Sequence, residues 1–228
     1  FISLYLRFKI VKSNCFISLG NIPPLLNLNC YSILFMGNRY IIDSISTKSF
    51  GLKTRLRINI ERLLFFLFKN NVNEILVQSK SMQEILEKKT KKSQKNKIFA
   101  FFNNEYNYEK IAINSFYYDF IYVANDDPHK NHKNLLKSWF QLSKEKIYPS
   151  LCLVLPKNSF LIKKIESLKK IDPAIKINIE SNLNKDEVIS LIKSSKALIF
   201  PSFFESFGLP LIEAIKCKID IIASEKDF

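Results

Sequence analysis

Two carboxylates, Glu205 and Glu213, bracket a short segment that has the features of a helix N-terminus. Gly208 lets another group approach the backbone closely, and Pro210 suits the first helical turn, where its missing N–H is not needed. Free N–H groups and the positive end of the helix dipole favour a phosphate there. Carboxylates would repel that phosphate, so Glu205 and Glu213 suit a hydroxyl-rich group such as a sugar or a ribose. Taken singly, each is also explained as an ordinary loop or first-turn acid.

A second polar stretch, residues 126–134 with the sequence DDPHKNHKN, follows an apolar run and precedes an amphipathic one. Lysines at a helix N-terminus add positive charge to the helix dipole, which suits a diphosphate. Both histidines of the chain, His129 and His132, stand beside aspartates here, so a metal site and a solvated loop are alternative interpretations. No further ligand cluster appears elsewhere, and we expect no bound metal.

Both stretches require strands and helices in alternation to position them. The predicted strands are residues 15–19, 33–36, 74–78, 98–102, 120–124, 151–155, 175–179, 197–200 and 220–223. The predicted helices are residues 52–69, 134–142, 159–170, 184–193 and 209–216, and one from Ser81. Ser159 is the predicted cap of its helix, and Ser81 with Glu84 and Asn184 with Glu187 form predicted capping boxes. Strict alternation predicts an α/β fold with doubly wound parallel sheets.

Two incomplete Rossmann-like domains are predicted, residues 1–102 and residues 118–228, joined by a polar and aromatic linker at residues 103–117. The last predicted strand lacks the helix that would cover it, and residue 1 is Phe rather than Met. We therefore expect a chain that is truncated at both ends and belongs to a longer gene product.

Composition narrows the classes of function. A formal charge of +14 suits nucleic acid, anionic lipid or phosphorylated small molecules. The lysine-rich run at residues 80–97 is either such a surface or a solvated helix and loop. Four widely spaced glycines cannot build a P-loop or a GxGxxG motif, which excludes kinases, GTPases and NAD-dependent dehydrogenases. The four cysteines form no CxxC pair, which excludes a zinc ribbon and fits a reducing, cytoplasmic compartment.

Residues 205–214, ESFGLPLIEA, resemble the E-x7-E motif of the family 4 retaining glycosyltransferases, which have the GT-B fold. The resemblance implies that Glu213 accepts hydrogen bonds from the ribose of a nucleotide-sugar donor. It also implies that Glu205 lies at the catalytic centre and holds the hydroxyls of the transferred sugar. Backbone N–H groups for the sugar and the diphosphate would come from Ser206, Phe207, Gly208 and Leu209.

Residues 122–135, YVANDDPHKNHKNL, resemble the start of the second domain in bacterial members that build O-antigen and capsule. In those enzymes the Lys before Asn binds the donor diphosphate, and that position here is Lys130. Many members have an Arg six residues earlier, where this chain has Ala124. His129 or Lys133 would then supply the phosphate contact that is lost.

Four segments of the first half resemble the acceptor domain of the same enzymes: FISLGNIPP at 16–24, GNRY at 37–40, RINIER at 57–62 and VQSKSM at 77–82. The resemblance implies transfer of a hexose, with mannose as the candidate, from a UDP- or GDP-linked donor to a lipid-linked or polysaccharide acceptor, with retention and without a cofactor. An inactive fragment or split-gene piece of such an enzyme is the alternative. A basic nucleic-acid-binding protein is a third hypothesis, but the chain has no RRM, KH, zinc or helix-turn-helix motif, and we expect no nucleic acid partner.

The predicted helix at residues 52–69 is both apolar and basic. Its apolar face carries Leu56, Ile60, Leu63, Leu64 and Leu67. The basic residues beside that face are Lys53, Arg55, Arg57, Arg62 and Lys69. Such a helix could make peripheral contact with an anionic membrane at the inner face of the cell. A core helix with a basic outer face is the alternative, and we favour it.

Overall fold

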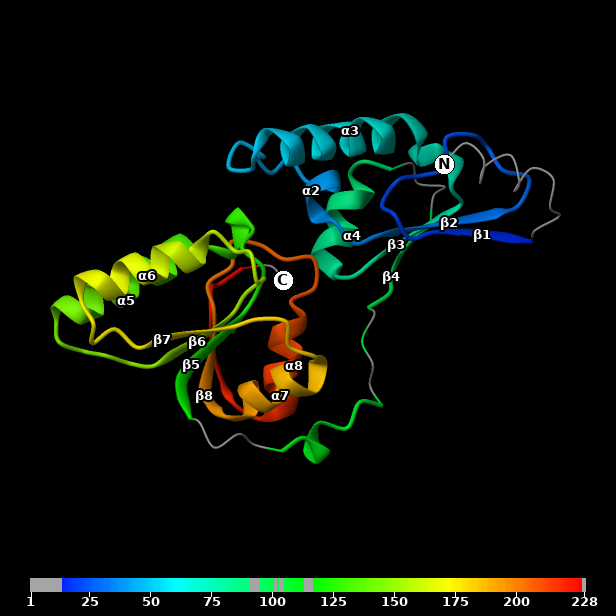
Figure 1. Ribbon diagram of the computed structural model, residues 1–228. Helices are drawn as coiled ribbons and strands as arrows, with labels where there is room; N and C mark the ends of the chain where they lie inside the picture. Colours follow the sequence, from blue (N-terminus) through cyan, green and yellow to red (C-terminus); the bar gives the residue numbers. More distant parts are fainter. Residues whose placement is uncertain (1–13, 91–94, 101, 103–104, 113–116, 227–228) are drawn as a thin grey trace. The chain divides into compact units, whose positions relative to one another are not determined.

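The computed structural model describes residues 14–90, 95–100, 102, 105–112 and 117–226 (Figure 1). The chain divides into an N-terminal unit, residues 1–101, and a C-terminal unit, residues 102–227. Each unit is built around its own sheet, and all of the described strand pairs are parallel. The predicted α/β class with parallel sheets is therefore confirmed.

The N-terminal unit holds a four-stranded sheet in the order β1-β2-β3-β4. Its strands are β1 (Cys15–Ser18), β2 (Tyr31–Met36), β3 (Glu74–Val77) and β4 (Lys95–Ile98). Its helical elements are α2 (Arg39–Ile42), α3 (Leu52–Phe68), η1 (Lys69–Asn71) and α4 (Lys80–Glu87). The core lies where β2 and β3 meet these helices, and Leu34, Met36, Ile75 and Met82 are fully buried in it.

The C-terminal unit holds a five-stranded sheet in the order β7-β6-β5-β8-β9. Its strands are β5 (Tyr118–Val123), β6 (Leu151–Val154), β7 (Ile177–Glu180), β8 (Ser195–Phe200) and β9 (Asp220–Ala223). Its helical elements are η2 (Tyr108–Lys110), η3 (Pro128–Lys130), α5 (His132–Lys144), α6 (Leu161–Ile171), α7 (Lys185–Lys193) and α8 (Leu209–Cys217). Helices α5 and α6 cover one face of the sheet and α7 and α8 the other, which explains why the central strands are apolar on both faces (Figure 1).

The strand order of the C-terminal sheet reverses between β5 and β8. From β5 the chain moves outward to β6 and β7, and it then returns to place β8 on the other side of β5. The segments that follow β5 and β8 therefore leave the carboxyl edge of the sheet side by side. Such a switch point is where open α/β sheets bind ligands.

Of the two predicted capping boxes, one is confirmed and the other is wrong. The capping box at α7 is confirmed, because Glu187 N donates to Asn184 Oδ1 (3.0 Å) and Asn184 N to Glu187 Oε2 (2.6 Å). The capping box predicted at Ser81 is wrong, since α4 begins earlier, at Lys80. There Ser79 is the N-cap, and its hydroxyl accepts from Met82 N (3.4 Å).

The edge strand of the N-terminal sheet is β4, which lies earlier than the strand predicted at residues 98–102. It pairs with β3 from Glu74↔Lys95 to Val77↔Ile98. Lys97 Nζ also forms an ion pair with Glu74 Oε1 across the two strands (2.9 Å). Because β4 is an edge strand with mostly polar residues, its sequence contains no apolar run that would predict it.

The predicted linker, residues 103–117, stays a prediction, but its described residues 105–112 pack on the C-terminal unit. Ser190 Oγ of α7 donates to Ala112 O (2.6 Å), and Lys193 Nζ donates to Ile111 O (2.9 Å). The 3-10 turn η2 contacts α8. Residues 105–112 therefore cover part of the outer surface of α7 and α8.

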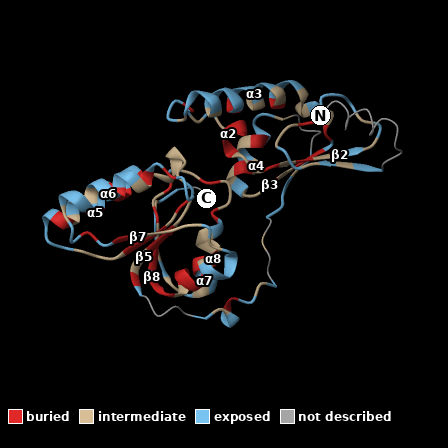
Figure 2. Cartoon of the chain, in the orientation of Figure 1, coloured by how far each residue is buried: buried red, intermediate tan, exposed pale blue. Residues whose placement is uncertain are grey.

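The face of α3 that periodicity assigned to the core is exposed instead. Ile58 and Phe65 are the buried residues of this helix, whereas Leu56, Ile60 and Leu63 are exposed (Figure 2). Because α3 has apolar residues on two opposite faces, their spacing could not decide which face packs on the sheet. The predicted inward face is therefore wrong, whereas α3 does pack on the core, through Ile58 and Phe65, and leaves basic residues exposed.

Candidate functional site

The two polar stretches of the C-terminal unit meet at the switch point. One follows β5 at residues 124–131, and the other follows β8 at residues 201–208. Phe203 N donates to His129 O (2.9 Å), and Asn131 Nδ2 donates to Pro201 O (3.0 Å). Sequence analysis treated the stretches separately, and the structure joins them into one site.

At the centre of this site lies an ion pair between Lys130 and Glu205. Lys130 Nζ stands 2.7 Å from Glu205 Oε1, and the side chains are only 15% and 9% exposed. Each charge compensates the other in a place where water is largely excluded. Removal of either partner would leave a buried charge uncompensated.

Tyr122 and Ser202, which sequence analysis missed, form hydrogen bonds next to the ion pair and hold the backbone of Lys130. The Tyr122 hydroxyl donates to Lys130 O (2.8 Å) and shares a hydrogen bond with Ser202 Oγ (3.0 Å). Both side chains are fully buried, and burial raises the pKa of Tyr122, so the phenol stays neutral. A tyrosine in a buried strand was the available signal, since a buried hydroxyl requires a partner.

His129 lies flat against Phe204, with ring centroids 4.8 Å apart and an interplanar angle of 17°. Burial, with a further contribution from Lys130, lowers the pKa of His129 to about 4. At neutral pH it is therefore an uncharged imidazole and brings no positive charge to a phosphate. Lys133, the other candidate phosphate contact, is exposed in the first turn of α5.

His132 is buried, and its Nε2 lies 2.7 Å from Asn125 O. Its ring stands 4.9 Å from the ring of Tyr122, and burial lowers its pKa. Asn125 Nδ2 also donates to Asp127 Oδ2 (2.8 Å). Within the residues that the structure describes, no group of three or more His, Cys, Asp or Glu side chains is placed to hold a metal ion.

Helix α8 begins directly after the loop that carries Glu205. Gly208 is its N-cap with φ 73°, a left-handed conformation that favours glycine. No side chain caps this helix start, and Pro210 occupies its first turn. The loop and the first turn contain the residues predicted to present N–H groups: Ser206, Phe207, Gly208 and Leu209.

Glu213 lies further along α8, and it is buried at 6% exposure. Burial raises its pKa, and the nearby Lys185 at the start of α7 opposes the rise. Burial, and secondarily the charge of Glu213, raise the pKa of Tyr108 in η2. Lys185 Nζ stands 3.9 Å from the ring centroid of Tyr106. Glu213 is thus a buried acid on α8 that faces α7 and the η2 segment.

In the N-terminal unit, segments that resemble the acceptor domain converge at the carboxyl edge of β2. Asn21 Oδ1 accepts from Gly37 N (2.7 Å) and Asn38 N (3.1 Å), which fixes the turn into α2. Asn38 then caps α2 by accepting from Tyr40 N (3.1 Å). Helix α2 has only four residues, too few to produce a recognisable period.

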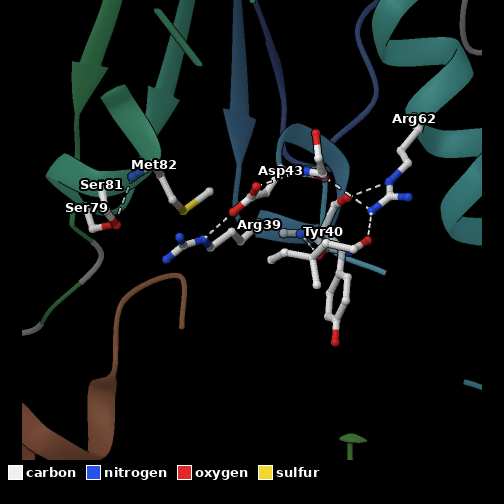
Figure 3. Close-up of polar contacts among 10 residues, drawn as sticks. Arg39, Tyr40, Asp43, Arg62, Ser79, Ser81 and Met82 are labelled. Carbon is white, nitrogen blue, oxygen red and sulfur yellow. Dashed lines mark hydrogen bonds and ion pairs between the residues drawn. The ribbon is translucent and has the colours of Figure 1, made fainter. Parts of the chain in front are cut away.

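Two arginines brace the segment after α2 from opposite sides (Figure 3). Arg39 is buried and its Nε forms an ion pair with Asp43 Oδ2 (3.0 Å). Arg62 of α3 donates to the carbonyls of Tyr40 (2.8 Å), Ile45 (2.6 Å) and Asp43 (3.2 Å). Ser79 and the start of α4 complete this edge of the unit.

Solved structures share this architecture. The similar chains include WaaG, a glycosyltransferase involved in lipopolysaccharide biosynthesis, with a TM-score of 0.67, 12% identity, and coverage of 97% of this chain and 62% of that one. For Anabaena Alr3699/HepE in complex with UDP-glucose the values are 0.60, 14%, 86% and 54%. For TarM they are 0.61, 15%, 88% and 37%. A search of curated proteins found no match.

The fold is therefore that of the GT-B glycosyltransferases, of which this chain spans between 37% and 62% of the length of those three structures. The sequence profile described as "Glycosyl transferases group 1" matches residues 103–228, more than half of the chain. The matched residues contain the whole switch-point site. The chain belongs to this glycosyltransferase family.

Proposed function

We propose that this chain binds a nucleotide diphosphate sugar and takes part in transferring its hexose to a glycan or lipid-linked glycan acceptor. The observation that carries the proposal is the ion pair between the partly buried Lys130 and the buried Glu205, in the loop that leads to α8, whose start has no side-chain cap. A cation and the N–H groups of a helix N-terminus suit the diphosphate, and a carboxylate suits the sugar hydroxyls.

Lys130 has a central role in this proposal. An ammonium group has three donors, so Lys130 can keep its hydrogen bond to Glu205 while it binds a phosphate oxygen. The bond to the sugar breaks with growing negative charge on the diphosphate, which Lys130 and the first turn of α8 stabilise. Glu205, held by Lys130, orients the sugar at that point.

Glu213 binds the ribose of the donor. A buried carboxylate needs hydrogen-bond donors, and two adjacent ribose hydroxyls supply them. The raised pKa of Glu213 fits a site that is short of such donors until the nucleotide arrives. This role, like that of Glu205, is supported by the E-x7-E motif at residues 205–214.

The finer features of the reaction are proposals that the motifs support. They are membership of family 4, retention of configuration, a UDP- or GDP-linked donor with mannose as candidate sugar, and a role in O-antigen or capsule synthesis. Retention would follow from attack of the acceptor on the face that the diphosphate leaves, with the diphosphate helping to deprotonate the acceptor. The UDP-glucose complex of HepE and the lipopolysaccharide role of WaaG are compatible with such a donor and acceptor. We place the reaction in the cytoplasm without a metal or other cofactor.

Calorimetry with UDP and GDP tests the site. Lys130→Ala and Glu213→Ala should each weaken nucleotide binding by about tenfold or more, since each removes a charged hydrogen-bond partner. Lys137→Ala is the matched control, because it removes an exposed lysine from α5. Unchanged affinity in both site variants would overturn the assignment. Nucleotide binding without sugar transfer would favour the alternative of an inactive piece of an enzyme.

A further inference from the structure

Two buried hydroxyl groups connect the strands that lead into the candidate site. Tyr122 lies near the end of β5, and Ser202 follows the end of β8, the neighbour of β5 in the sheet (Figure 1). Their oxygens are 3.0 Å apart, and the Tyr122 oxygen is 2.8 Å from the carbonyl oxygen of Lys130. We call the two hydroxyls and this carbonyl the hydroxyl bridge.

The hydrogen bonds of the hydroxyl bridge run in one direction. A carbonyl oxygen only accepts, so the single proton of the Tyr122 phenol is donated to Lys130. The Tyr122 oxygen must then accept the hydroxyl proton of Ser202. Burial raises the pKa of Tyr122, which keeps its proton in place at neutral pH. Loss of the phenol oxygen would therefore take a partner from both Lys130 and Ser202.

The core fixes the ring of Tyr122. Its ring stands edge-on to Phe200, with centroids 5.9 Å apart and an interplanar angle of 87°. On another side it lies 4.9 Å from the ring of the buried His132. Because close packing leaves such a ring little freedom to shift, the phenol oxygen is a fixed point. The backbone of the loop after β5 is attached to that point at Lys130.

Lys130 benefits from this attachment because its side chain is long and flexible. Its amide N donates to Asp127 O (3.0 Å), and its carbonyl accepts from Tyr122. At the far end, its ammonium donates to Glu205 Oε1 (2.7 Å). Lys130 is therefore held at both ends, and the position of its peptide decides where the ammonium lies.

We propose that Tyr122 and Ser202 are positioning residues for the diphosphate end of the donor site, and that they act through Lys130. They hold its peptide where the ammonium can bind Glu205 and a phosphate oxygen together. A cation that is ordered before the ligand arrives binds more tightly, because the cost of ordering it is not paid on binding. Both hydroxyl side chains are fully buried, so neither is placed to touch the donor itself. The inference rests on the proposed function and assigns it two further residues.

A purely structural role is the other explanation of the hydroxyl bridge. The same hydrogen bonds would then only hold the ends of β5 and β8 together, and their loss would weaken binding of every part of a ligand alike. A positioning role predicts a selective loss. Contact with the diphosphate weakens, whereas contact with the nucleoside does not, since Glu213 lies on α8 and not on the loop after β5.

Calorimetry of the full chain with UDP and GDP, and ligand-observed NMR with uridine and guanosine, measures this selectivity. Tyr122→Phe should weaken binding of the nucleoside diphosphate by about tenfold and binding of its nucleoside by less than about twofold. Ser202→Ala should weaken binding of the diphosphate by about threefold, because Tyr122 still donates to Lys130. Equal losses for nucleoside and diphosphate would overturn the proposal.

The double variant Tyr122→Phe/Lys130→Ala shows whether Tyr122 acts through Lys130. Once the lysine side chain is gone, the bridge has nothing left to position. The double variant should therefore bind the nucleoside diphosphate within about twofold of Lys130→Ala alone. Losses that simply add would assign Tyr122 an independent role and refute the proposal.

Matched controls lie at the other end of the same two strands. Tyr118 begins β5 and Ser195 begins β8, and the two are buried and paired in register. The Tyr118 hydroxyl accepts from Asn178 Nδ2 (3.3 Å), and Ser195 Oγ donates to Leu191 O (2.8 Å). Tyr118→Phe and Ser195→Ala thus remove buried, hydrogen-bonded hydroxyls far from Lys130. Both controls should keep the affinity of the parent for the nucleoside diphosphate, and a loss as large as that of the bridge variants would count against positioning.

Melting temperatures establish that each variant is folded, and Ser202→Ala decides the question if Tyr122→Phe does not fold. Failure of this proposal differs from failure of the donor site. If only the positioning role is wrong, Lys130→Ala weakens binding of UDP or GDP and the bridge variants do not. If the donor site itself is wrong, the parent chain binds neither nucleotide, and both proposals fall together.

Discussion

At the scale of single residues, the site contains two buried carboxylates, and only one of them, Glu205, forms an ion pair at hydrogen-bond distance in the described residues. Glu205 is held by Lys130 at 2.7 Å. Glu213 is equally buried, and its pKa is raised because burial outweighs the opposing charge of Lys185. An acid kept in such a place lowers stability at neutral pH, which is typical of groups retained for binding rather than for folding.

The first prediction concerns Glu213 and pH. Its native pKa lies above the ordinary value of 4.5, so the folded state binds the proton more tightly than the unfolded chain. The free energy of unfolding therefore falls as pH rises from 4.5 through the native pKa. Glu213→Gln removes this loss, so its melting temperature should exceed that of the parent at pH 8, and the difference should shrink at pH 5.

Thermal unfolding at both pH values measures the effect, and Glu166→Gln on the exposed side of α6 is the control. The control should not change the pH dependence. A stability gain of Glu213→Gln that grows toward acid would contradict a buried carboxylate whose charged form is disfavoured.

At the scale of elements, apolar periodicity identified most strands and helices, but it did not predict which face of a helix packs on the sheet. Strand β9 was predicted with its observed bounds, Asp220–Ala223, because its apolar residues Ile221, Ile222 and Ala223 follow an aspartate and precede a polar segment. Helix α3 was predicted with the wrong face inward, because it is apolar on both sides. Helix α2 was missed, because a single turn held by Asn38 has no period.

The candidate site was predictable as two motifs and not as one place. Lys130 and Glu205 are 75 residues apart, and no local pattern records that their side chains meet. Tyr122 and Ser202 belong to the same network, yet they carry no motif of their own. Their role follows only from the pairing of β5 with β8, which is a property of topology.

The second prediction concerns the end of α8. Lys218 is its C-cap with φ 59°, a left-handed conformation that costs energy for any residue with a Cβ atom. Lys218→Gly should raise the free energy of unfolding by about 0.5–1 kcal/mol. Lys216→Gly, two residues earlier and within the helix, should lower it by about 1 kcal/mol. Urea denaturation measures both, and a destabilised Lys218→Gly would refute the assigned cap.

At the scale of the whole molecule, the chain is two units with separate sheets and separate surfaces. The C-terminal unit holds every residue proposed to bind the donor, and the N-terminal unit holds the exposed apolar face of α3. The family profile matches the C-terminal unit and not the N-terminal unit. We therefore expect the proposed donor binding to be separable from the N-terminal unit.

The third prediction follows from this separation. A fragment of residues 102–228 should unfold in one cooperative transition and bind UDP or GDP within about tenfold of the whole chain. Circular dichroism and calorimetry measure these properties, with Lys130→Ala in the fragment as the control for specific binding. A fragment that folds but does not bind nucleotide would show that the C-terminal unit alone is not sufficient.

The all-parallel pairing of the described strands has a consequence for how the protein acquires its site. Parallel neighbours cannot be joined by a tight hairpin, so every pair must wait for a crossover to close. The pairing of β5 with β8, at Tyr118↔Ser195, encloses β6 and β7 and is the longest closure in its sheet. Long closures are slow steps in folding. Lys130 and Glu205 meet only when this pairing is complete, so we expect the proposed donor site to be among the last parts of this unit to form during folding.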